Sequence, residues 1–200
     1  MRKDAAGVLH FKIVLYGPSM SGKTTSLRWI YNEINGMQKG GLTSIEDPAG
    51  RTLFFDWLPM AVNENIVFDV YTTAGQIRHL HQRQLVVKGA DGVLFVADSD
   101  PRQMQDNIES MKELVDTLGD RLGTEIPLVI TLNKRDSDGA VPREQMLKEL
   151  GLDGGQIGLH VYETIATRGL GVKRAFQCVA REIVLKKLYG LKPRSTEQSG

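Results

Sequence analysis

A glycine-bounded loop near the start of the chain limits the possible folds more than any other feature. The segment GPSMSGKTT, residues 17–25, follows the apolar run HFKIVLY and precedes SLRWIYNEI. The first flank predicts a buried strand, and the second predicts a helix, because its apolar side chains recur at the spacing of one helix face. The chain must therefore turn from a strand into a helix through backbone that carries few large side chains.

Strand-like and helix-like segments alternate along the rest of the sequence. We expect strands at 11–17, 52–60, 65–72, 91–99, 126–134 and 160–166, and helices at 22–34, 102–122, 142–150 and 171–190. The second and third of these strands are expected to pair as a hairpin. Residues 35–50, rich in Gly, Asn, Asp and Pro, are expected to form a long loop. The alternation predicts an α/β fold with a six-stranded, mostly parallel sheet, one antiparallel edge strand and helices on both faces.

Size and composition are those of an ordinary globular protein. The chain has 200 residues, and we expect one domain over 1–190 and a polar, disordered tail over 191–200. Lys and Arg number 25 against 24 Asp and Glu, so a net charge of +1 argues against bulk electrostatic binding of nucleic acid. No apolar run approaches the ~20 residues that span a bilayer. We therefore expect a cytoplasmic protein with no direct membrane anchor, monomeric on its own.

The only cysteine of the sequence is Cys178. One cysteine excludes an internal disulfide and suits a reducing compartment. Its setting in the helix-like segment RAFQCVAREIVLKKL predicts a buried, structural thiol rather than a reactive one.

The glycine-bounded loop has the residue types of a phosphate-binding site. It matches the pattern G-x-x-x-x-G-K-[ST] in full. In such a loop, backbone N–H groups surround phosphate oxygens, the lysine reaches the β- and γ-phosphates, and the hydroxyl binds Mg²⁺. The alternative is a glycine-rich turn with an exposed lysine. The position of the loop between a strand and a helix favours the phosphate-binding interpretation. The predicted phosphate-binding residues are Gly17, Ser19, Met20, Ser21, Gly22, Lys23, Thr24 and Thr25.

The segment NKRD, residues 133–136, indicates which nucleotide would bind. It follows the apolar run PLVITL, so it lies at the carboxyl end of a strand. A carboxylate at Asp136 can accept two hydrogen bonds from the N1–H and amino group of guanine, and adenine offers no such pair of donors. The stem of Lys134 can lie over the base plane. Alone, this short motif would indicate only a solvated charged turn; after a phosphate loop it predicts a guanine site.

A third motif, YTTAGQ, follows the strand expected at 65–72. Gly75 is placed to donate a backbone N–H to the γ-phosphate, and Gln76 to orient an attacking water. The alternative for Gln76 is a solvated glutamine at the start of a helix, which the phosphate loop makes the weaker interpretation.

These three motifs resemble those of the Ras-like small GTPases, over about residues 8–187. The sequence is most similar to the MglA family of prokaryotic small GTPases, which act in cell polarity and gliding motility. That similarity lies in KIVLYGPSMSGKTTSLRWIY, RTLFFDWLP, VYTTAGQ, VKGADGVLFVADS and NKRD. The resemblance implies a P-loop NTPase small G domain that binds GTP and GDP with Mg²⁺ and hydrolyses GTP.

The resemblance also implies roles for further residues. Thr52 would bind Mg²⁺ and sense the γ-phosphate, and Arg51 would act as an arginine finger supplied in cis. The segment TIATRG resembles the last base loop, with the backbone N–H of Ala166 near the guanine oxygen. The implied guanine-binding residues are Asn133, Lys134, Asp136, Ala166 and Thr167. The implied partners are activators and effectors that bind the switch loops, among them an MglB-like roadblock-domain activator.

Three positions depart from the usual pattern of small GTPases. Thr72 stands where most have an aspartate that holds Mg²⁺ through water; threonine there is an MglA-like trait that weakens the metal shell. Ser19 replaces a frequent glycine, and its side chain can crowd Gln76. Ile165 replaces the usual serine of the last base loop.

The expected function is a guanine-nucleotide switch that hydrolyses GTP slowly alone and faster with a partner that positions Gln76 and Arg51. One alternative is a GTP-binding scaffold with little hydrolysis, for which Ser19 and Thr72 would be the reasons. Another is an ATP-using P-loop kinase, against which the NKRD segment argues.

Overall fold

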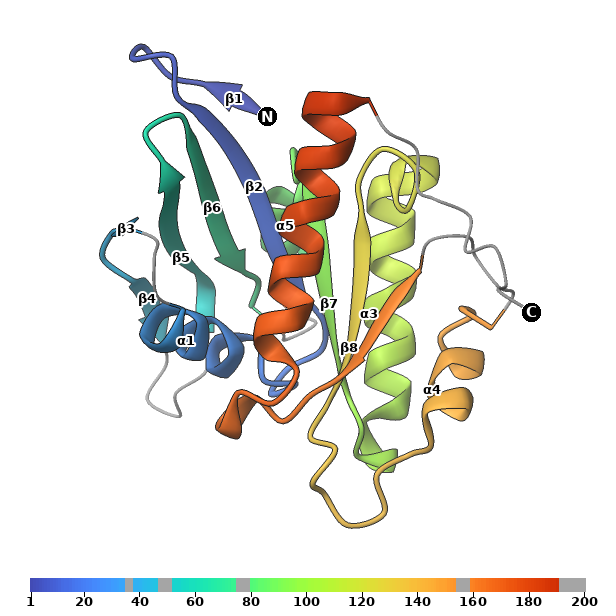
Figure 1. Cartoon of the computed structure of the whole chain (residues 1–200). Coiled ribbons are helices and arrows are strands. Elements are labelled where there is room, and N and C mark those ends of the chain that lie inside the picture. The colour runs from blue at the N-terminus through green and yellow to red at the C-terminus, as the bar shows by residue number, and fades with distance from the viewer. Residues whose placement is uncertain (35–37, 47–51, 75–79, 154–158, 191–200) are drawn as a thin grey trace, which may run out of the picture.

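Within the described residues, the fold is a nine-stranded sheet with helices on both faces (Figure 1). The computed structural model describes residues 1–34, 38–46, 52–74, 80–153 and 159–190. The strands are β1 (Arg2–Lys3), β2 (Leu9–Tyr16), β3 (Gln38–Lys39), β4 (Thr43–Glu46), β5 (Thr52–Asn63), β6 (Ile66–Thr72), β7 (Gly92–Asp98), β8 (Leu128–Asn133) and β9 (His160–Glu163). The helices are α1 (Lys23–Glu33), α2 (Leu80–Val87), α3 (Met104–Leu118), α4 (Arg143–Glu149) and α5 (Val172–Tyr189).

The main body of the sheet has the order β5-β6-β2-β7-β8-β9. Strands β6, β2, β7, β8 and β9 run parallel to one another, and β5 is antiparallel to β6. The predicted α/β fold with a mostly parallel sheet is therefore confirmed, and so is the hairpin formed by β5 and β6.

Three short strands and one helix were not expected from the sequence. Strands β3 and β4 pair antiparallel with β5, and β1 pairs antiparallel with β2. Two pieces of the expected loop at 35–50 are therefore strands, and β5 is not the outermost strand along its whole length. These short polar segments pair through backbone groups and carry no apolar alternation that periodicity could detect. Helix α2 is short and only weakly amphipathic, LHQRQLVV, which explains why it was missed.

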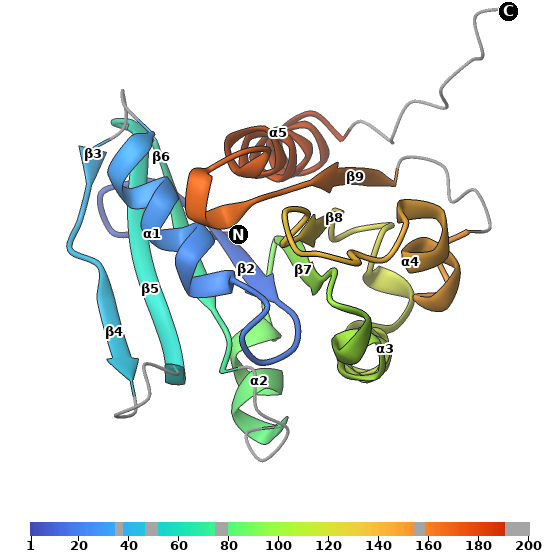
Figure 2. The same cartoon turned by 90° about the horizontal axis from the view of Figure 1, so that it is seen from below.

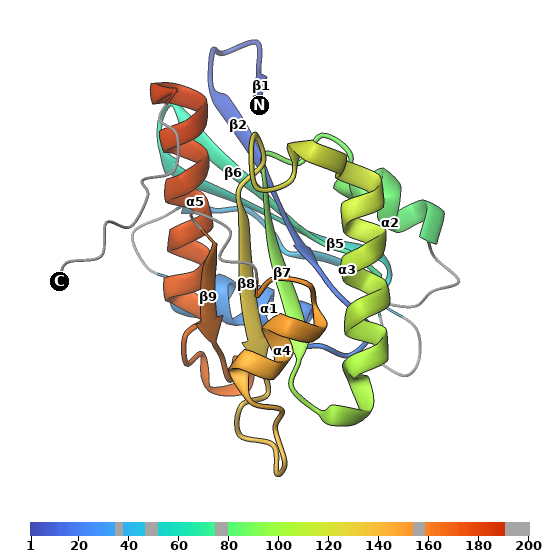
Figure 3. The same ribbon diagram turned by 90° about the vertical axis from the view of Figure 1, so that its right-hand side faces the viewer.

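Separate hydrophobic cores join the sheet to the helices on each face. On one face, Phe11, Ile13 and Leu15 of β2 pack with side chains of α1 and α5. On the other face, Val14 and Tyr16 pack in a cluster that includes side chains of α2, α3 and α4. Figures 2 and 3 show these helix layers from two directions. Every residue of β7 and β8 is buried, because both faces of these strands are covered, and this produces their continuous apolar runs.

The carboxyl ends of the parallel strands all open to one edge of the sheet, where α1 begins. Ligands of open α/β sheets bind beyond this edge, so the fold itself places the candidate site there. Cys178 is buried within α5, as expected. None of the helices in the described ranges combines the length and the apolar character needed to cross a membrane.

Candidate functional site

The loop between β2 and α1 is pressed against the ends of β7 and β8. Gly17 has φ of 142° and Gly22 has φ of 101°, both in the region that favours glycine. A Cβ on Gly17 would lie 2.3 Å from the backbone oxygen of Val96, and one on Gly22 would lie 2.2 Å from Nδ2 of Asn133. Both glycines are therefore required by backbone conformation and by contact, and together they let the chain turn directly into α1.

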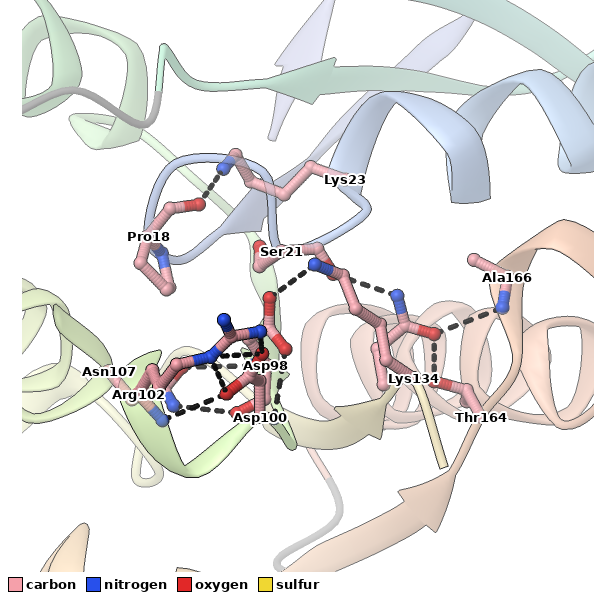
Figure 4. Close-up of polar contacts among 11 residues, drawn as sticks. Pro18, Ser21, Lys23, Asp98, Asp100, Arg102, Asn107, Lys134, Thr164 and Ala166 are labelled. Atoms are coloured by element: carbon pink, nitrogen blue, oxygen red, sulfur yellow. Dashed lines mark hydrogen bonds and ion pairs between the residues drawn. The ribbon is translucent and has the colours of Figure 1, made fainter. Parts of the chain in front are cut away.

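Lys23, the first residue of α1, is buried rather than exposed. Only 5% of its surface is accessible. Its Nζ donates to the backbone oxygens of Gly17 at 3.0 Å and Pro18 at 2.5 Å, so the loop folds around the ammonium group. Figure 4 shows the contact with Pro18. Burial lowers the pKa of Lys23 to about 7, with a further lowering from the charge of Arg83 and an opposing effect from Asp56. This contradicts the exposed-lysine alternative. An anion at the loop would favour the charged form of Lys23.

A buried carboxylate lies beside the start of α1, and sequence reasoning missed it. Asp56 of β5 has no accessible surface. Its Oδ2 accepts hydrogen bonds from Oγ1 of Thr24 at 2.7 Å and from Oγ1 of Thr72 at 2.6 Å. The backbone N–H of Asp56 in turn donates to Oγ1 of Thr72 at 3.0 Å. A carboxylate and a hydroxyl are the hard oxygen groups that Mg²⁺ prefers, so these residues fit that ion.

The position of Asp56 is relevant to Thr72, which stands where most small GTPases have an aspartate. Strand β6 supplies a threonine there, and the neighbouring strand β5 supplies a carboxylate that contacts both this threonine and Thr24. Along β5, Asp56, Leu58 and Met60 are buried while the residues between them are partly exposed, so Asp56 lies at an inward position. The sequence signal that could have identified Asp56 is an acidic residue at one of the alternate strand positions that face the protein interior.

Asn133, at the end of β8, joins the phosphate loop to the segment after β9. Its Nδ2 donates to the backbone oxygen of Ser21 at 2.7 Å. Its Oδ1 accepts from the backbone N–H of Ala166 at 3.0 Å and from Oγ1 of Thr164 at 3.1 Å. The second hydrogen of Nδ2 is not used by these bonds. Asn133 therefore fixes the relative position of two loops.

The two charged residues that follow differ in their surroundings. Lys134 has φ of 64°, and its Nζ lies 2.5 Å from Oδ2 of the fully buried Asp98 at the end of β7 (Figure 4). Asn107 of α3 holds that strand end by hydrogen bonds to both backbone polar groups of Asp98. The side chain of Asp136 is exposed. The lysine is thus fixed in place, and the carboxylate is accessible to a ligand.

Several predicted residues fall outside what the structure describes. Gly75, Gln76 and Arg51 lie beyond the described residues. Thr52 begins β5, and nothing is described of its side chain.

The remaining predicted residues lie around the same edge of the sheet. Ser19 is half-buried and Met20 is 62% exposed in the phosphate loop, and Thr25 is exposed in the first turn of α1. Thr167 is exposed in the short turn that follows β9. Ser21 is fully buried, and its Oγ has no hydrogen-bond partner among the described residues.

The arrangement brings an enclosed ammonium group, a hydroxyl beside a buried carboxylate, and an exposed carboxylate to one edge of the sheet. Lys23 in its loop provides the ammonium group, and Thr24 with Asp56 provides the hydroxyl and the buried carboxylate. Asp136 lies on the segment that Asn133 ties to the phosphate loop. A ligand with phosphates at one end and a hydrogen-bonding ring at the other has the matching chemistry.

Comparisons with known proteins found similar sequences over most of the chain. The model of the Ras family matches residues 12–185. The mutual gliding-motility protein MglA of Myxococcus xanthus (strain DK1622) is 40% identical over 186 residues, covering 90% of this chain and 93% of that protein. ADP-ribosylation factor-like protein 6 of Caenorhabditis elegans is 27% identical over 172 residues, covering 86% of this chain and 85% of that protein.

A solved structure shares the fold. The Arl6 BBS3 small GTPase from Trypanosoma brucei, with the bound nucleotide analogue GppNp, superposes with a TM-score of 0.62. The alignment covers 88% of this chain and 98% of that chain, at 19% sequence identity. At this identity the likeness supports the fold alone.

Proposed function

Because this chain belongs to the Ras family and is a small GTPase similar to MglA, we propose that it is a Mg²⁺-dependent guanine-nucleotide switch whose hydrolysis of GTP is slow until a partner accelerates it. The observation that carries the proposal is the buried ammonium of Lys23, enclosed by carbonyl oxygens of its own loop. A cation buried in this way needs an anionic partner to offset its desolvation, and nucleotide phosphates provide one.

The proposed phosphate site uses the backbone of the loop and the side chain of Lys23. Met20 has φ of 60° and Gly22 has φ of 101°, so the backbone here can turn its N–H groups inward. The amino end of α1 adds the positive end of a helix dipole. Gly75 would donate a further backbone N–H to the γ-phosphate.

The proposed metal site consists of the hydroxyls of Thr24 and Thr52, with Asp56 as the supporting carboxylate. When bound, Mg²⁺ would neutralise charge on the phosphates. Thr24 already donates to Asp56, so the two side chains are held close together. We propose that Asp56 takes the part that the aspartate at position 72 plays in most small GTPases, and this removes one reason for the alternative of a non-hydrolysing scaffold.

The proposed base site lies between the segments that follow β8 and β9. Asp136 would accept hydrogen bonds from guanine, and the stem of Lys134 would cover the ring. The contact of Lys134 with Asp98 supports this role, because it holds the stem in one place. Asn133, Ala166 and Thr167 would complete the site.

The proposed catalytic residues are Gln76 and Arg51. Gln76 would orient water, and Arg51 would stabilise charge on the transferred phosphoryl group. Single-turnover GTP hydrolysis by the wild type, Gln76→Ala and Arg51→Ala tests them, with and without roadblock-domain candidates. Arg143→Ala, an exposed arginine of α4, is the matched control. With an activator, loss of an arginine finger should slow hydrolysis by on the order of 10³-fold, while the control is unchanged.

Equal rates for all four proteins, with an activator that binds the GTP form, would reject the catalytic assignment. The scaffold with little hydrolysis would then be the better account.

We further propose an MglB-like roadblock-domain activator and a role in cell polarity or gliding motility, supported by the similarity to MglA. A cytoplasmic location is proposed because GTP is available there.

We also propose that residues 1–190 form one GTPase domain, supported by the packing of α5 against the sheet. Truncation after residue 190 should then leave GDP affinity unchanged.

A further inference from the structure

Three side chains with metal-binding groups meet between β9 and α5. His160 is the first residue of β9, and Cys178 and Glu182 lie on α5. One potential ligand atom from each residue lies within 4.8 Å of the other two, and Nε2 of His160 is 3.7 Å from Oε1 of Glu182. Figure 3 shows β9 running alongside α5. His160 opens its strand, so the cluster lies at the opposite end of the sheet from the nucleotide site.

The spacing of these residues explains why they meet. Cys178 and Glu182 are four residues apart on a helix and therefore share one face, one turn apart. That face packs against β9 and presents both side chains to His160. From its sequence context, Cys178 is predicted only to be a buried structural thiol, because the approach of β9 to α5 leaves no local sequence pattern.

The chemistry of the three groups favours a borderline-soft divalent ion. Thiolate, imidazole and carboxylate are the ligand types of Zn²⁺, which takes four ligands in a tetrahedron. Three protein ligands leave one position open. His160 and Glu182 also line a cavity of about 720 Å³ between the ends of α3, α4 and α5, which gives an ion a route of entry and leaves room for a water ligand.

Two cationic side chains, Arg181 and Lys186, lie near the cluster. Nη2 of Arg181 lies 3.1 Å from Oε1 of Glu182, but Arg181 is 62% exposed, so its guanidinium can turn to solvent when an ion takes this oxygen. Nζ of Lys186 donates to the backbone oxygens of Gly123 and Thr124, at 2.9 and 2.6 Å, and its charge also interacts with Glu182. The thiolate of Cys178 and the carboxylate of Glu182 together can balance the charge of a divalent ion.

We propose that His160, Cys178 and Glu182 form a Zn²⁺ site whose fourth position opens to the adjacent cavity. Binding removes one proton from the thiol of Cys178 and releases it to solvent. The ion links β9 to α5, and β9 leads directly into the turn at 166–168 of the proposed guanine site. Zn²⁺ should therefore stabilise the carboxyl-terminal part of the fold without entering the nucleotide site.

Cobalt spectroscopy of the full chain tests this site. The protein is saturated with Mg²⁺ and GDP and then titrated with Co²⁺. Cys178 is the only cysteine, so a thiolate-to-cobalt charge-transfer band can arise only from its coordination. The proposal requires this band at one equivalent, with the visible bands of tetrahedral Co²⁺, and displacement of Co²⁺ by Zn²⁺. Absence of the charge-transfer band would overturn it.

Variants separate this site from other ways of binding the metal. Cys178→Ser, His160→Gln and Glu182→Gln should each weaken Zn²⁺ affinity by at least about tenfold, the lower bound seen for loss of supporting residues at metal sites. The rise in Tm that Zn²⁺ produces in the wild type should disappear in all three. Glu125→Gln, an exposed glutamate in an ion pair with Arg121, is the matched control and should keep both properties. Unchanged affinity in His160→Gln and Glu182→Gln would refute the three-ligand site.

Discussion

Replacing Asp56 by asparagine should separate the proposed metal role from general stability. The Oδ2 atom of Asp56 accepts two short hydrogen bonds, at 2.6 and 2.7 Å, in a position with no accessible surface. Hydrogen bonds to a charged group contribute about 1.5–3 kcal/mol each, and neutral ones about 1 kcal/mol. Asparagine keeps an acceptor and loses the charge, so we expect a loss of roughly 1–4 kcal/mol of stability.

The effect on metal affinity should be distinct from that loss. A supporting residue that orients a metal ligand typically changes affinity by about 10–100-fold. We therefore expect Asp56→Asn to raise, by roughly that factor, the Mg²⁺ concentration needed to retain GDP. Release of a fluorescent GDP analogue, measured across a Mg²⁺ titration, gives this value directly.

A control variant is available on the neighbouring strand. Asp69 of β6 is also nearly buried, at 7% exposed, and its carboxylate contacts His10 and Trp57, away from the phosphate loop. Asp69→Asn should lose stability while keeping the Mg²⁺ dependence of the wild type. If the Mg²⁺ dependence is the same in Asp56→Asn, Asp69→Asn and the wild type, Asp56 has no part in holding the metal.

Three further predictions follow from the site. Burial lowers the pKa of Lys23 to about 7, so the unfolded chain binds more protons than the folded one between that pH and about 10.5. The unfolding free energy of the nucleotide-free wild type, measured by denaturant titration, should therefore rise by about 2 kcal/mol from pH 7 to pH 9 relative to that of Lys23→Met. If the wild type shows no such rise relative to the variant, this reasoning is contradicted. Asn133→Ala removes bonds to Ser21, Thr164 and Ala166, so calorimetry should find roughly 3 kcal/mol lost and Tm lower by on the order of 10 °C. Asp136→Asn should shift preference from GDP toward XDP in competition binding, because the amide N–H would face the donating amino group of guanine, where xanthine has an accepting carbonyl oxygen.

The sequence predicts those parts of the site that lie in one continuous segment. The phosphate loop is such a part, because its glycines, Lys23 and Thr24 are neighbours and the strand and helix around them have clear periodicity. The alternating order of strands and helices likewise predicted the mostly parallel sheet, since a parallel connection needs a crossover.

What the sequence did not predict depends on contacts between distant segments. The contact of Asp56 with Thr24 joins residues far apart in the chain and depends on how β5 lies beside α1. The burial of Lys23 follows from the path of the loop around it, and the pairing of Lys134 with Asp98 follows from the alignment of β7 with β8. Strands β3 and β4 are polar segments that are strands only because β5 is beside them.

Equilibrium affinities for GDP and ADP test the central claim most directly. They should be measured with Mg²⁺ by calorimetry on the wild type, on Lys23→Ala and on Lys148→Ala, an exposed lysine of α4 that serves as the control. A site built to hydrogen-bond guanine should reject adenine by on the order of 10⁴-fold. We predict that margin in the wild type and in the control, and loss of tight GDP binding in Lys23→Ala with the circular dichroism spectrum unchanged. Affinities for ADP and GDP within tenfold of each other, or undiminished GDP binding by Lys23→Ala, would contradict the account.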